Sequence, residues 1–373
     1  MNIAVNTRLL IKDRLEGIGW FSYHTLKRIV QQHPEHRFFF IFDRNFDEDF
    51  IFSSNVTPIV AGLPTRHPLL WYLWFEFTVP RVLKKIGADI FLSTDGYLSL
   101  STLTPQIAVI HDLNFAHNPE YLPFLTAKYY NFFFPKFARK AVRLGTVSEY
   151  SKNDIVNTYN IEPDKIDVCY NGITEVFKPL SSNEKQKKQN EICNGSEYFV
   201  FVGALNPRKN VSGLLKAFDI YQEQGGKKHL VIVGDAMHKT DDINKTLEQM
   251  SFRDKVHFEG RLNLEDLSQT LASAFAMVFV PHFEGFGIPL VEAMRCEIPI
   301  ICSDTTSLPE VAGEAALYSS PKDLDKIADN MLLLENDNKL QQKLIEAGKI
   351  QQNKFSWDKS ADRLWNCIEK AVM

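Results

Sequence analysis

Two glutamates, Glu284 and Glu292, are the residues of this sequence whose type and spacing point most directly to ligand chemistry. They lie in the segment HFEGFGIPLVEAM (282–294), which follows an apolar run typical of a buried strand. An ionised carboxylate accepts several hydrogen bonds, so each can hold the neighbouring hydroxyls of a sugar ring or a ribose. A capped helix with solvated acids would explain one glutamate alone, but not the whole segment.

The residues between the two glutamates predict an anion site. Gly287 lets the backbone approach a ligand closely, and Pro289 suits the first turn of a helix because it lacks an N–H group. The backbone amides of Gly287 and Ile288 would then point out of the helix N-terminus, where the helix dipole favours negative charge. The segment therefore predicts a pocket for a ligand that carries both hydroxyls and phosphate.

A second group follows the expected strand 198–203. Gly203 ends this strand, and Arg208 and Lys209 stand near the start of the next helical segment. Two cations at such a position can neutralise a diphosphate, because Arg can bind it through two hydrogen bonds and Lys acts as a point charge. A solvated surface pair is the alternative, but the position directly after a strand favours the ligand site.

Three weaker features also follow expected strands. Gly17 and Gly19 form a short glycine loop that lacks the last glycine of GxGxxG, so a simple turn is the alternative. His111 ends the expected strand 106–111, where it is either a satisfied polar residue or a ligand contact. Arg261 follows the expected strand 256–259.

Short apolar runs rich in Val, Ile and Phe alternate with longer segments of helical pattern along the chain. Such runs are typical of strands buried on both faces of a parallel sheet, and their alternation with helices predicts βαβ units. Ligands bind outside the carboxyl ends of such strands, where the residues above are expected. The expected strands form two sets, 2–6, 37–43, 89–94, 106–111, 144–148 and 166–170, then 198–203, 229–234, 256–259, 276–280, 298–302 and 316–319.

The two sets predict an α/β protein with two Rossmann-like domains facing a central cleft. We expect the first domain at 1–177 and the second at 198–356. Residues 178–197 are expected to be a linker, because they are polar, lysine-rich and without periodicity. Helical patterns follow at 324–335, 338–352 and 357–372, and the last of them, about 357–373, is expected to join the first domain.

Bulk properties exclude several classes of protein. The length of 373 residues suits two domains that each bury a core, and the net charge of −4 argues against nucleic acid as a partner. The cysteines, at 169, 193, 296, 302 and 367, include no CxxC pair, so neither a disulfide framework nor a zinc site is predicted. No signal peptide or membrane-spanning segment is apparent, which predicts a cytoplasmic protein.

The segment 284–292 (EGFGIPLVE) resembles the E-x7-E motif of the retaining glycosyltransferases of the GT-B fold, in particular glycosyltransferase family 4. The segment 203–210 (GALNPRKN) is similar to the family's G-x-x-x-x-(R/K)-K-N pattern, and 111–115 (HDLNF) is close to its histidine motif. The likeness covers nearly the whole chain and is most specific in the second half. It implies a GT-B fold with an acceptor domain first and a donor domain second.

The resemblance also implies how the donor is bound. Glu284 would contact hydroxyls of the transferred sugar, Glu292 would contact the nucleotide ribose, and the backbone at Phe286–Ile288 would meet the distal phosphate. Arg261 would lie beside the nucleotide base, which this fold holds largely by backbone.

For the reaction, the resemblance implies that Arg208 and Lys209 stabilise the leaving nucleoside diphosphate in place of a metal. No DxD pair follows a strand where it could hold Mg²⁺, so we expect neither a metal nor another cofactor. His111 would line the sugar pocket, and Gly17 and Gly19 would reach a phosphate or the acceptor. The anomeric configuration of the sugar would be retained.

Likeness to mannosyltransferases of surface-polysaccharide clusters makes GDP-mannose the first choice of donor, with a glycan or lipid-linked acceptor. A transferase that uses a UDP-sugar is the alternative. Outside this class stand a GT-B-fold sugar-nucleotide epimerase, an inactive nucleotide-sugar-binding subunit and an NAD-dependent oxidoreductase. The last would use Asp43 as its ribose-binding acid, but would leave Arg208 and Glu284 without a role.

The aromatic stretches 71–77 and 129–134 allow two interpretations. At helical spacing they fit a core. They also fit a first-domain surface in peripheral contact with the inner face of the cell membrane or with a lipid-linked acceptor.

Overall fold

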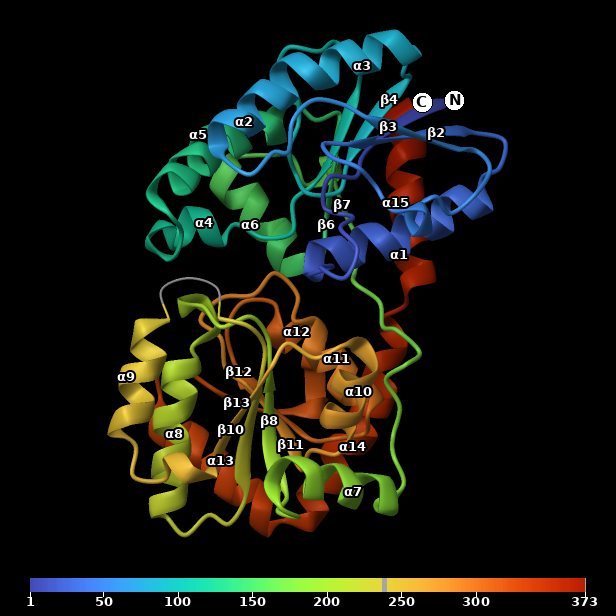
Figure 1. Cartoon of the computed structure of the whole chain (residues 1–373). Helices are drawn as coiled ribbons and strands as arrows, with labels where there is room; N and C mark the ends of the chain where they lie inside the picture. The colour runs from blue at the N-terminus through green and yellow to red at the C-terminus, as the bar shows by residue number, and fades with distance from the viewer. Residues whose placement is uncertain (237–239, 373) are drawn as a thin grey trace. The chain divides into compact units, whose positions relative to one another are not determined.

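The computed structural model describes residues 1–236 and 240–372 (Figure 1). The chain forms two compact units, one made of Met1–Gly172 with Ser356–Met373 and the other of Ile173–Phe355. Each unit contains one wholly parallel sheet with helices packed against it, so the prediction of two Rossmann-like α/β domains is confirmed. Within the described residues, no helix combines the length and the apolar character needed to cross a bilayer.

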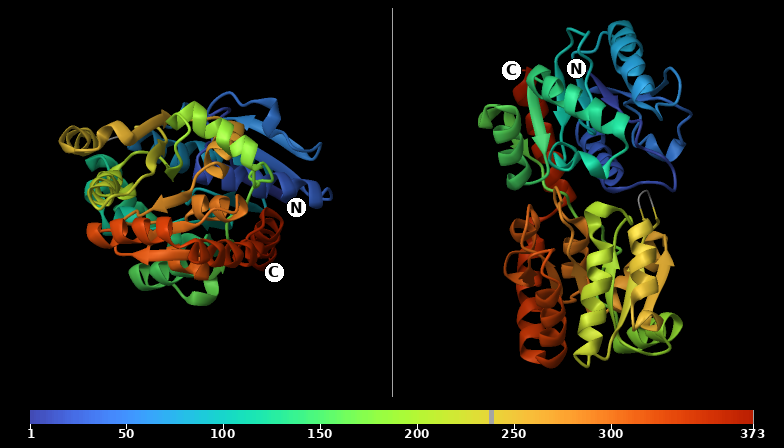
Figure 2. Two further views of the ribbon diagram at one scale, coloured as in Figure 1. Left: turned by 90° about the horizontal axis from the view of Figure 1, so that it is seen from below. Right: turned by 90° about the vertical axis from the view of Figure 1, so that its left-hand side faces the viewer.

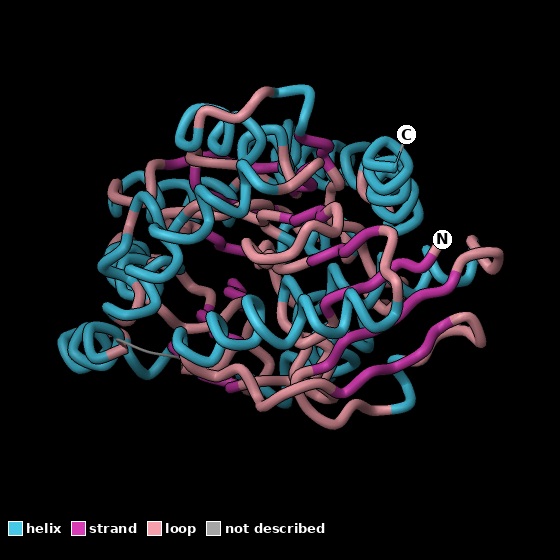
Figure 3. The backbone as a smooth tube through the Cα atoms, turned by 90° about the horizontal axis from the view of Figure 1, so that it is seen from above, coloured by secondary structure: helices cyan, strands magenta, loops and turns pink. Residues whose placement is uncertain are grey.

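The first unit has a seven-stranded sheet in the order β3-β2-β1-β4-β5-β6-β7, and helices cover it on both sides (Figures 2 and 3). The C-terminal helix packs beside the first helix of the chain. The strands are β1 (Asn2–Asn6), β2 (Arg37–Phe42), β3 (Val56–Val60), β4 (Ile90–Ser93), β5 (Gln106–Val109), β6 (Arg143–Thr146) and β7 (Ile166–Val168). The helices are α1 (Gly17–Gln32), α2 (Pro68–Leu73), η2 (Trp74–Thr78), α3 (Val79–Ile86), α4 (Asn114–His117), α5 (Phe124–Lys140), α6 (Glu149–Tyr159) and α15 (Trp357–Val372).

One strand of this sheet, β3, was not predicted. It is an edge strand that pairs only with β2 in the described sheet, and its burial is incomplete. Pro58 lies in it, where the missing N–H group is tolerated because an edge strand has an unpaired side. An edge strand therefore lacks the continuous apolar run that identifies the central strands.

The second unit has a six-stranded sheet in the order β10-β9-β8-β11-β12-β13, and every strand in it was predicted. The strands are β8 (Tyr198–Val202), β9 (His229–Val233), β10 (Val256–Gly260), β11 (Ala276–Phe279), β12 (Ile300–Ser303) and β13 (Ala316–Ser319). The helices are α7 (Ser182–Cys193), η5 (Pro207–Lys209), α8 (Val211–Glu223), α9 (Asp241–Gln249), α10 (Leu264–Ala272), α11 (Ile288–Arg295), α12 (Leu308–Ala312), α13 (Leu324–Asn336) and α14 (Asn338–Gln351). Six single 3-10 turns complete the two units: η1 (Glu48–Phe50), η3 (Pro119–Tyr121), η4 (Pro163–Lys165), η6 (Arg253–Lys255), η7 (Gly313–Ala315) and η8 (Gln352–Lys354).

The linker predicted at 178–197 is wrong, because helix α7 occupies most of it and the second unit already begins at Ile173. Ser181 and Glu184 form a capping box: the hydroxyl of Ser181 accepts from the Glu184 N–H, and the Glu184 carboxylate accepts from the Ser181 N–H at 2.8 Å. The Lys, Gln and Glu residues that suggested a solvated linker are also good helix formers. Gln189 and Cys193 are buried, which fixes α7 to the unit.

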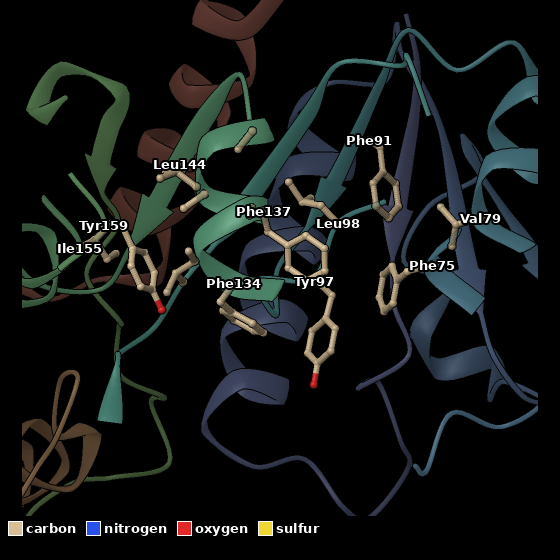
Figure 4. Packing of buried hydrophobic residues seen from close by; sticks show 14 of the residues in the cluster. Phe75, Val79, Phe91, Tyr97, Leu98, Phe134, Phe137, Leu144, Ile155 and Tyr159 are labelled. Atoms are coloured by element: carbon tan, nitrogen blue, oxygen red, sulfur yellow. The ribbon is translucent and has the colours of Figure 1, made fainter. Parts of the chain in front are cut away.

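The aromatic stretches of the first unit are divided between the core and the surface. Phe75 and Phe134 are buried in one cluster with Phe137, around the ring of Tyr97 (Figure 4). The Tyr97 ring centroid lies 5.2 Å from that of Phe75 and 5.3 Å from that of Phe134. The remaining faces of the same helices are exposed, with Phe132 at 57% of its possible surface.

Candidate active site

The loops after β8 and β11 meet at the carboxyl edge of the second sheet. These two strands are neighbours, so the residues that follow them are brought to one place. The Arg208 carbonyl accepts a hydrogen bond from the His282 N–H at 2.8 Å, which joins the loops directly. Gly203 directly follows β8 with φ of +155°, which residues with a side chain rarely adopt, and a Cβ there would lie 3.6 Å from Cε of Lys209.

Glu284 is paired with both cations of the neighbouring loop. Nζ of Lys209 lies 2.5 Å from Oε1 of Glu284, and a guanidinium nitrogen of Arg208 lies 3.7 Å from Oε2. Burial alone would raise the pKa of Glu284, but the charges of Arg208 and Lys209 and the Lys209 hydrogen bond hold it below its usual value. The carboxylate is therefore ionised, and it acts as the counter-ion of the cation pair.

Local structure fixes the two cations. Asn206 begins the turn η5, and its side-chain oxygen accepts from the Lys209 N–H at 3.3 Å. The Lys209 ammonium also lies 4.9 Å from the centre of the Phe279 ring. Asn210 adopts a left-handed conformation, and its amide donates to the carbonyls of Val280 and Pro321 at 3.0 and 2.8 Å. Arg208 and Lys209 are thus carried on a turn anchored to the end of β11.

Helix α11 begins beside this cluster. Gly287 is its N-cap, with φ of +96°, a conformation that L-residues with a side chain rarely adopt. A Cβ on Gly287 would come within 2.6 Å of Leu308. Ile288 is the first helical residue, so Pro289 lies in the first turn, as the sequence predicted. The buried Phe286 ring packs 5.3 Å from the Phe355 ring. At Phe286, only the backbone is therefore suited to a ligand.

The second glutamate differs from the first in its surroundings. Glu292 lies one turn inside α11, and its side chain is partly buried. Burial raises the pKa of Glu292 to about 8. Among the described residues, no hydrogen bond or ion pair engages its carboxyl group. The structure thus places Glu284 with Arg208 and Lys209, and leaves Glu292 available to another partner.

Arg261 follows β10, which is the outer strand on one side of the same sheet. Its side chain is exposed. Arg261 therefore lies at the same carboxyl edge of the sheet as Lys209. The strand that precedes Arg261 is two strands away from β8.

The remaining predicted residues lie in the first unit. Nε2 of His111 is 2.9 Å from the carbonyl oxygen of Thr94, which can only accept, so Nε2 carries the proton and Nδ1 is an acceptor. Burial lowers the pKa of His111, with partial opposition from the Thr94 carbonyl and two aspartates, so the ring is neutral near pH 7.

Gly17 is the first residue of α1, and a Cβ there would meet nothing within 4 Å. A Cβ on Gly19 would lie 3.3 Å from the Leu9 carbonyl oxygen. Gly19 therefore allows its backbone to pack closely against another segment of the protein.

A buried polar network at the carboxyl edge of the first sheet was not predicted. Nε of Arg8 donates to Oδ2 of Asp95 at 2.6 Å, and its guanidinium lies 4.1 Å from the centre of the Tyr97 ring. The Asn6 amide donates to Oδ1 of Asp95 at 2.8 Å. Arg8 and Asp95 each stand two positions beyond a strand, and so follow a strand at the carboxyl edge of a sheet as Arg208 does. They were missed because they belong to no recognised motif.

Comparison with known proteins defines the family. A family model described as glycosyl transferases group 1 matches residues 182–351, and one described as glycosyltransferase family 4 matches residues 16–175. O-antigen chain mannosyltransferase RfbU of Salmonella typhimurium is 30% identical over 271 residues, covering 72% of this chain and 71% of that protein. The chain belongs to glycosyltransferase family 4. It is therefore a glycosyltransferase, as the motifs around Arg208 and Glu284 implied.

Other similar proteins agree with this assignment. O-antigen chain mannosyltransferase B of Escherichia coli is 29% identical to this family 4 glycosyltransferase over 379 residues, covering 97% of this chain and 96% of that protein. A glycosyltransferase of Rickettsia africae has a similar fold, with a TM-score of 0.74 at 14% identity and coverage of 100% and 98%. The structure of Alr3699/HepE of Anabaena with UDP and glucose gives a TM-score of 0.74 at 16% identity, with coverage of 98% and 99%. These neighbours have the GT-B fold, so the fold predicted for this chain is confirmed.

Proposed function

We propose that this family 4 glycosyltransferase moves mannose from GDP-mannose to a glycan or lipid-linked acceptor during bacterial polysaccharide synthesis, with retention of configuration and without a metal. The observation that carries the proposal is the contact of Glu284 with both Arg208 and Lys209 beside the N-terminus of α11. The names of the similar proteins from Escherichia coli and Salmonella typhimurium, both O-antigen mannosyltransferases, support mannose as the sugar.

The cluster suits a nucleoside diphosphate sugar because it changes partners when the donor binds. In the free protein, Glu284 balances the charges of Arg208 and Lys209. The donor diphosphate brings its own negative charge, takes over the two cations, and leaves the Glu284 carboxylate to accept from sugar hydroxyls. The amides of Gly287 and Ile288 add to the binding of the distal phosphate.

The same cations assist the chemical step. Breaking the bond between the sugar and the diphosphate places additional negative charge on the leaving phosphate. Arg208 and Lys209 are held in position before the reaction, so they stabilise this charge without reorganising. The leaving phosphate takes the proton of the acceptor hydroxyl as the new glycosidic bond forms on the same face of the sugar. Glu284 remains a hydrogen-bond acceptor throughout and forms no bond to the sugar.

Glu292 fits the nucleotide ribose. Its carboxyl group has no partner among the described residues, and burial raises its pKa to about 8. A vicinal diol offers hydrogen bonds that would satisfy it, whether the carboxyl group is protonated or ionised. Arg261 lies on the same sheet edge and is proposed to border the base.

The acceptor is assigned to the first unit. His111 is proposed to contact a sugar through Nδ1, which can accept a hydrogen bond, and the buried pair of Arg8 and Asp95 stabilises the same sheet edge. Three elements, α2, η2 and α5, give this unit an apolar outer face. The exposed apolar side chains of this face are Leu69, Tyr72, Leu73, Phe77, Phe124, Leu125 and Phe132.

Positive charges border this apolar face. Nζ of Lys128 lies 4.3 Å from the centre of the Phe124 ring, and Nζ of Lys136 lies 3.2 Å from that of Phe132. Exposed Lys84 and Lys85 end α3. Apolar side chains surrounded by lysine fit an anionic bilayer surface, which would bring the enzyme to a lipid-linked acceptor at the inner face of the membrane. Flotation with vesicles containing anionic lipid tests this: Phe77→Ser with Phe132→Ser should remain with the vesicles much less than the wild-type protein.

The assignment of the donor is tested by measuring the release of nucleoside diphosphate from GDP-mannose and from UDP-sugars. We expect turnover of GDP-mannose, its loss in Glu284→Ala, and its retention in Glu248→Ala, which removes an exposed acid of α9 in the same unit. Turnover of a UDP-sugar alone would replace GDP-mannose by the alternative donor, which the UDP and glucose complex of the Anabaena structural neighbour favours. Full activity of Glu284→Ala would refute the site.

A further inference from the structure

Three side chains that commonly bind metal ions converge at the amino end of the second sheet. Cys193 is the last residue of α7, His229 is the first residue of β9, and His257 is the second residue of β10. Cys193 is buried, and the two histidines are partly buried. The thiol sulfur and one ring nitrogen of each histidine all lie within 4.8 Å of one another.

The fold itself brings these residues together. Strands β9 and β10 are parallel neighbours, and His257 pairs with Val231, two residues beyond His229. Because side chains alternate between the faces of a strand, both histidines lie on the same face of the sheet. Nδ1 of His229 is 2.8 Å from Nε2 of His257, and the two rings are inclined by only 12°.

Helix α7 brings the thiol to this face. The side chain of Gln189 donates to the Ser273 carbonyl at 2.9 Å, which anchors α7 to the unit one turn before Cys193. The helix then ends at Asn194 in a left-handed conformation. Within the described residues, no disulfide engages Cys193.

We propose that Cys193, His229 and His257 bind a divalent transition-metal ion of the zinc class. Thiolate and imidazole together suit zinc, which takes four ligands in a tetrahedron. Ordinary zinc bond lengths require about 3.3 Å between two ligand nitrogens and about 3.6 Å between sulfur and nitrogen. The two histidine nitrogens would therefore move apart by about half an ångström, and the sulfur would move by no more than about an ångström.

The fourth position has a candidate in the chain. The negative charge of the Glu259 carboxylate acts on both the Cys193 thiol and the His257 ring, so it lies close to the site. Glu259 falls where the pairing of β10 with β9 shifts register, between Phe258 and Gly260. A carboxylate oxygen or a water molecule would complete the tetrahedron.

This site is separate from the donor site and does not depend on the proposed function. Glu284 and Lys209 follow the carboxyl ends of strands, whereas His229 and His257 stand at the amino ends. Strands of about five residues place the two edges roughly 15 Å apart. A metal ion here would hold the end of α7 against β9 and β10, which is a structural role.

The first experiment measures metal binding directly in the full chain, free of any affinity tag and stripped of metal. Titration with Co²⁺ should give one bound ion per chain, with visible bands of a tetrahedral site and a near-ultraviolet band from thiolate to metal. Zn²⁺ should displace the cobalt and raise the thermal unfolding midpoint. Absence of binding, or a cobalt spectrum without the thiolate band, would overturn the proposal.

Variants locate the ion. Cys193→Ser should lose the thiolate band, and His257→Gln should weaken Zn²⁺ binding at least tenfold. Cys302→Ser, a buried thiol of the same unit, and His36→Ala, in the histidine pair of the first unit, should bind as the wild type does. Circular dichroism of the metal-free variants checks their fold, and if Cys193→Ser does not fold, the partly buried His257 gives the decisive variant. Survival of wild-type binding in His257→Gln, or of the thiolate band in a folded Cys193→Ser, would contradict the assignment.

Discussion

The ammonium of Lys209 lies 2.5 Å from Oε1 of Glu284, and Arg208 approaches the other oxygen of the same carboxylate at 3.7 Å. The three charges come from two loops that follow neighbouring strands, and all three side chains are mostly shielded from water. In such surroundings a cation and a carboxylate each depend on the other for charge compensation. The free protein therefore holds its diphosphate-binding cations with an internal anion that a ligand must replace.

Removal of this internal anion should separate binding from catalysis. In Glu284→Gln, Arg208 and Lys209 lose their competing partner, so GDP should bind about tenfold more tightly, or about 1.4 kcal/mol. Transfer should fall by at least about 100-fold, because the sugar loses its carboxylate contact. Calorimetry of GDP binding and a GDP-release assay measure the two effects. Glu248→Gln is the matched control, and weaker GDP binding in Glu284→Gln would contradict the exchange of partners.

Substitution of the cations should reduce the chemical step. Arg208→Ala and Lys209→Ala are each expected to lower kcat by about 100-fold, the usual effect of losing one preorganised charge at a developing anion. Arg208→Lys keeps the charge but loses the paired hydrogen bonds, so it should recover only part of the activity. Lys216→Ala, in the following helix α8, serves as control. If both alanine variants kept wild-type kcat, the cations would have no role in the reaction.

Replacement of Gly287 by a residue with a side chain should lower the stability of the protein for two reasons, and their contributions can be measured separately. Its φ of +96° is strained for other residues, and a Cβ would lie within 2.6 Å of Leu308. Gly225 has a similar φ of +92° but nothing within 4 Å of a Cβ. Gly225→Ala should therefore cost about 1 kcal/mol of stability, and Gly287→Ala about 2 kcal/mol more. Urea unfolding measures both, and equal losses would show that the Leu308 contact is unimportant.

Glu292 should make stability depend on pH. Its pKa is raised from 4.5 to about 8 in the folded protein, so the folded state retains a proton that the unfolded state loses. The stabilisation is complete below about pH 4.5 and falls as pH rises toward 8, by at most about 1.4 kcal/mol per pH unit. Glu292→Gln removes this loss. The free energy of unfolding of the variant minus that of wild type should therefore be larger at pH 8 than at pH 5.

The stability contributed by Glu284 should change with pH in the opposite direction, and Glu284 therefore provides the control for this experiment. Its pKa is lowered in the folded protein, so its contribution is present above pH 4.5 and is lost as pH falls through the folded value. The contribution of Glu284 is therefore constant between pH 5 and pH 8, so unfolding of wild type, Glu292→Gln and Glu284→Gln at these two pH values should show a pH-dependent difference for Glu292→Gln only. A difference between wild type and Glu292→Gln that stayed the same at both pH values would show that Glu292 has an ordinary pKa.

The sequence was sufficient to predict the central strands and the loops after them, because strands buried on both faces have an unmistakable apolar pattern. It could not identify β3, whose edge position permits Pro58 and partial exposure. It also mistook α7 for a linker, because a solvated helix and a disordered segment share the same residues. Only the capping box of Ser181 and Glu184 distinguishes them, and this signature was present in the sequence.

The composition of the site was predictable, but its internal contacts were not. Glu284 and Lys209 are 75 positions apart, and each was assigned to a different part of the donor. Their direct contact follows from the adjacency of β8 and β11, which the order of strands along the chain does not give. The cluster of Cys193, His229 and His257 was missed for the same reason, because a search for CxxC spacing finds only ligands that are close in sequence.

The most direct test of the account is the binding of GDP to the wild-type protein and to the variant with both Arg208→Ala and Lys209→Ala, measured by titration calorimetry. We predict stoichiometric binding by the wild type and at least 30-fold weaker binding by the double variant, compared at a temperature at which both are folded, because Glu284 without its counter-ions should lower the unfolding midpoint. Equal affinity in the two folded proteins would show that the diphosphate binds elsewhere, and the central claim would then be wrong.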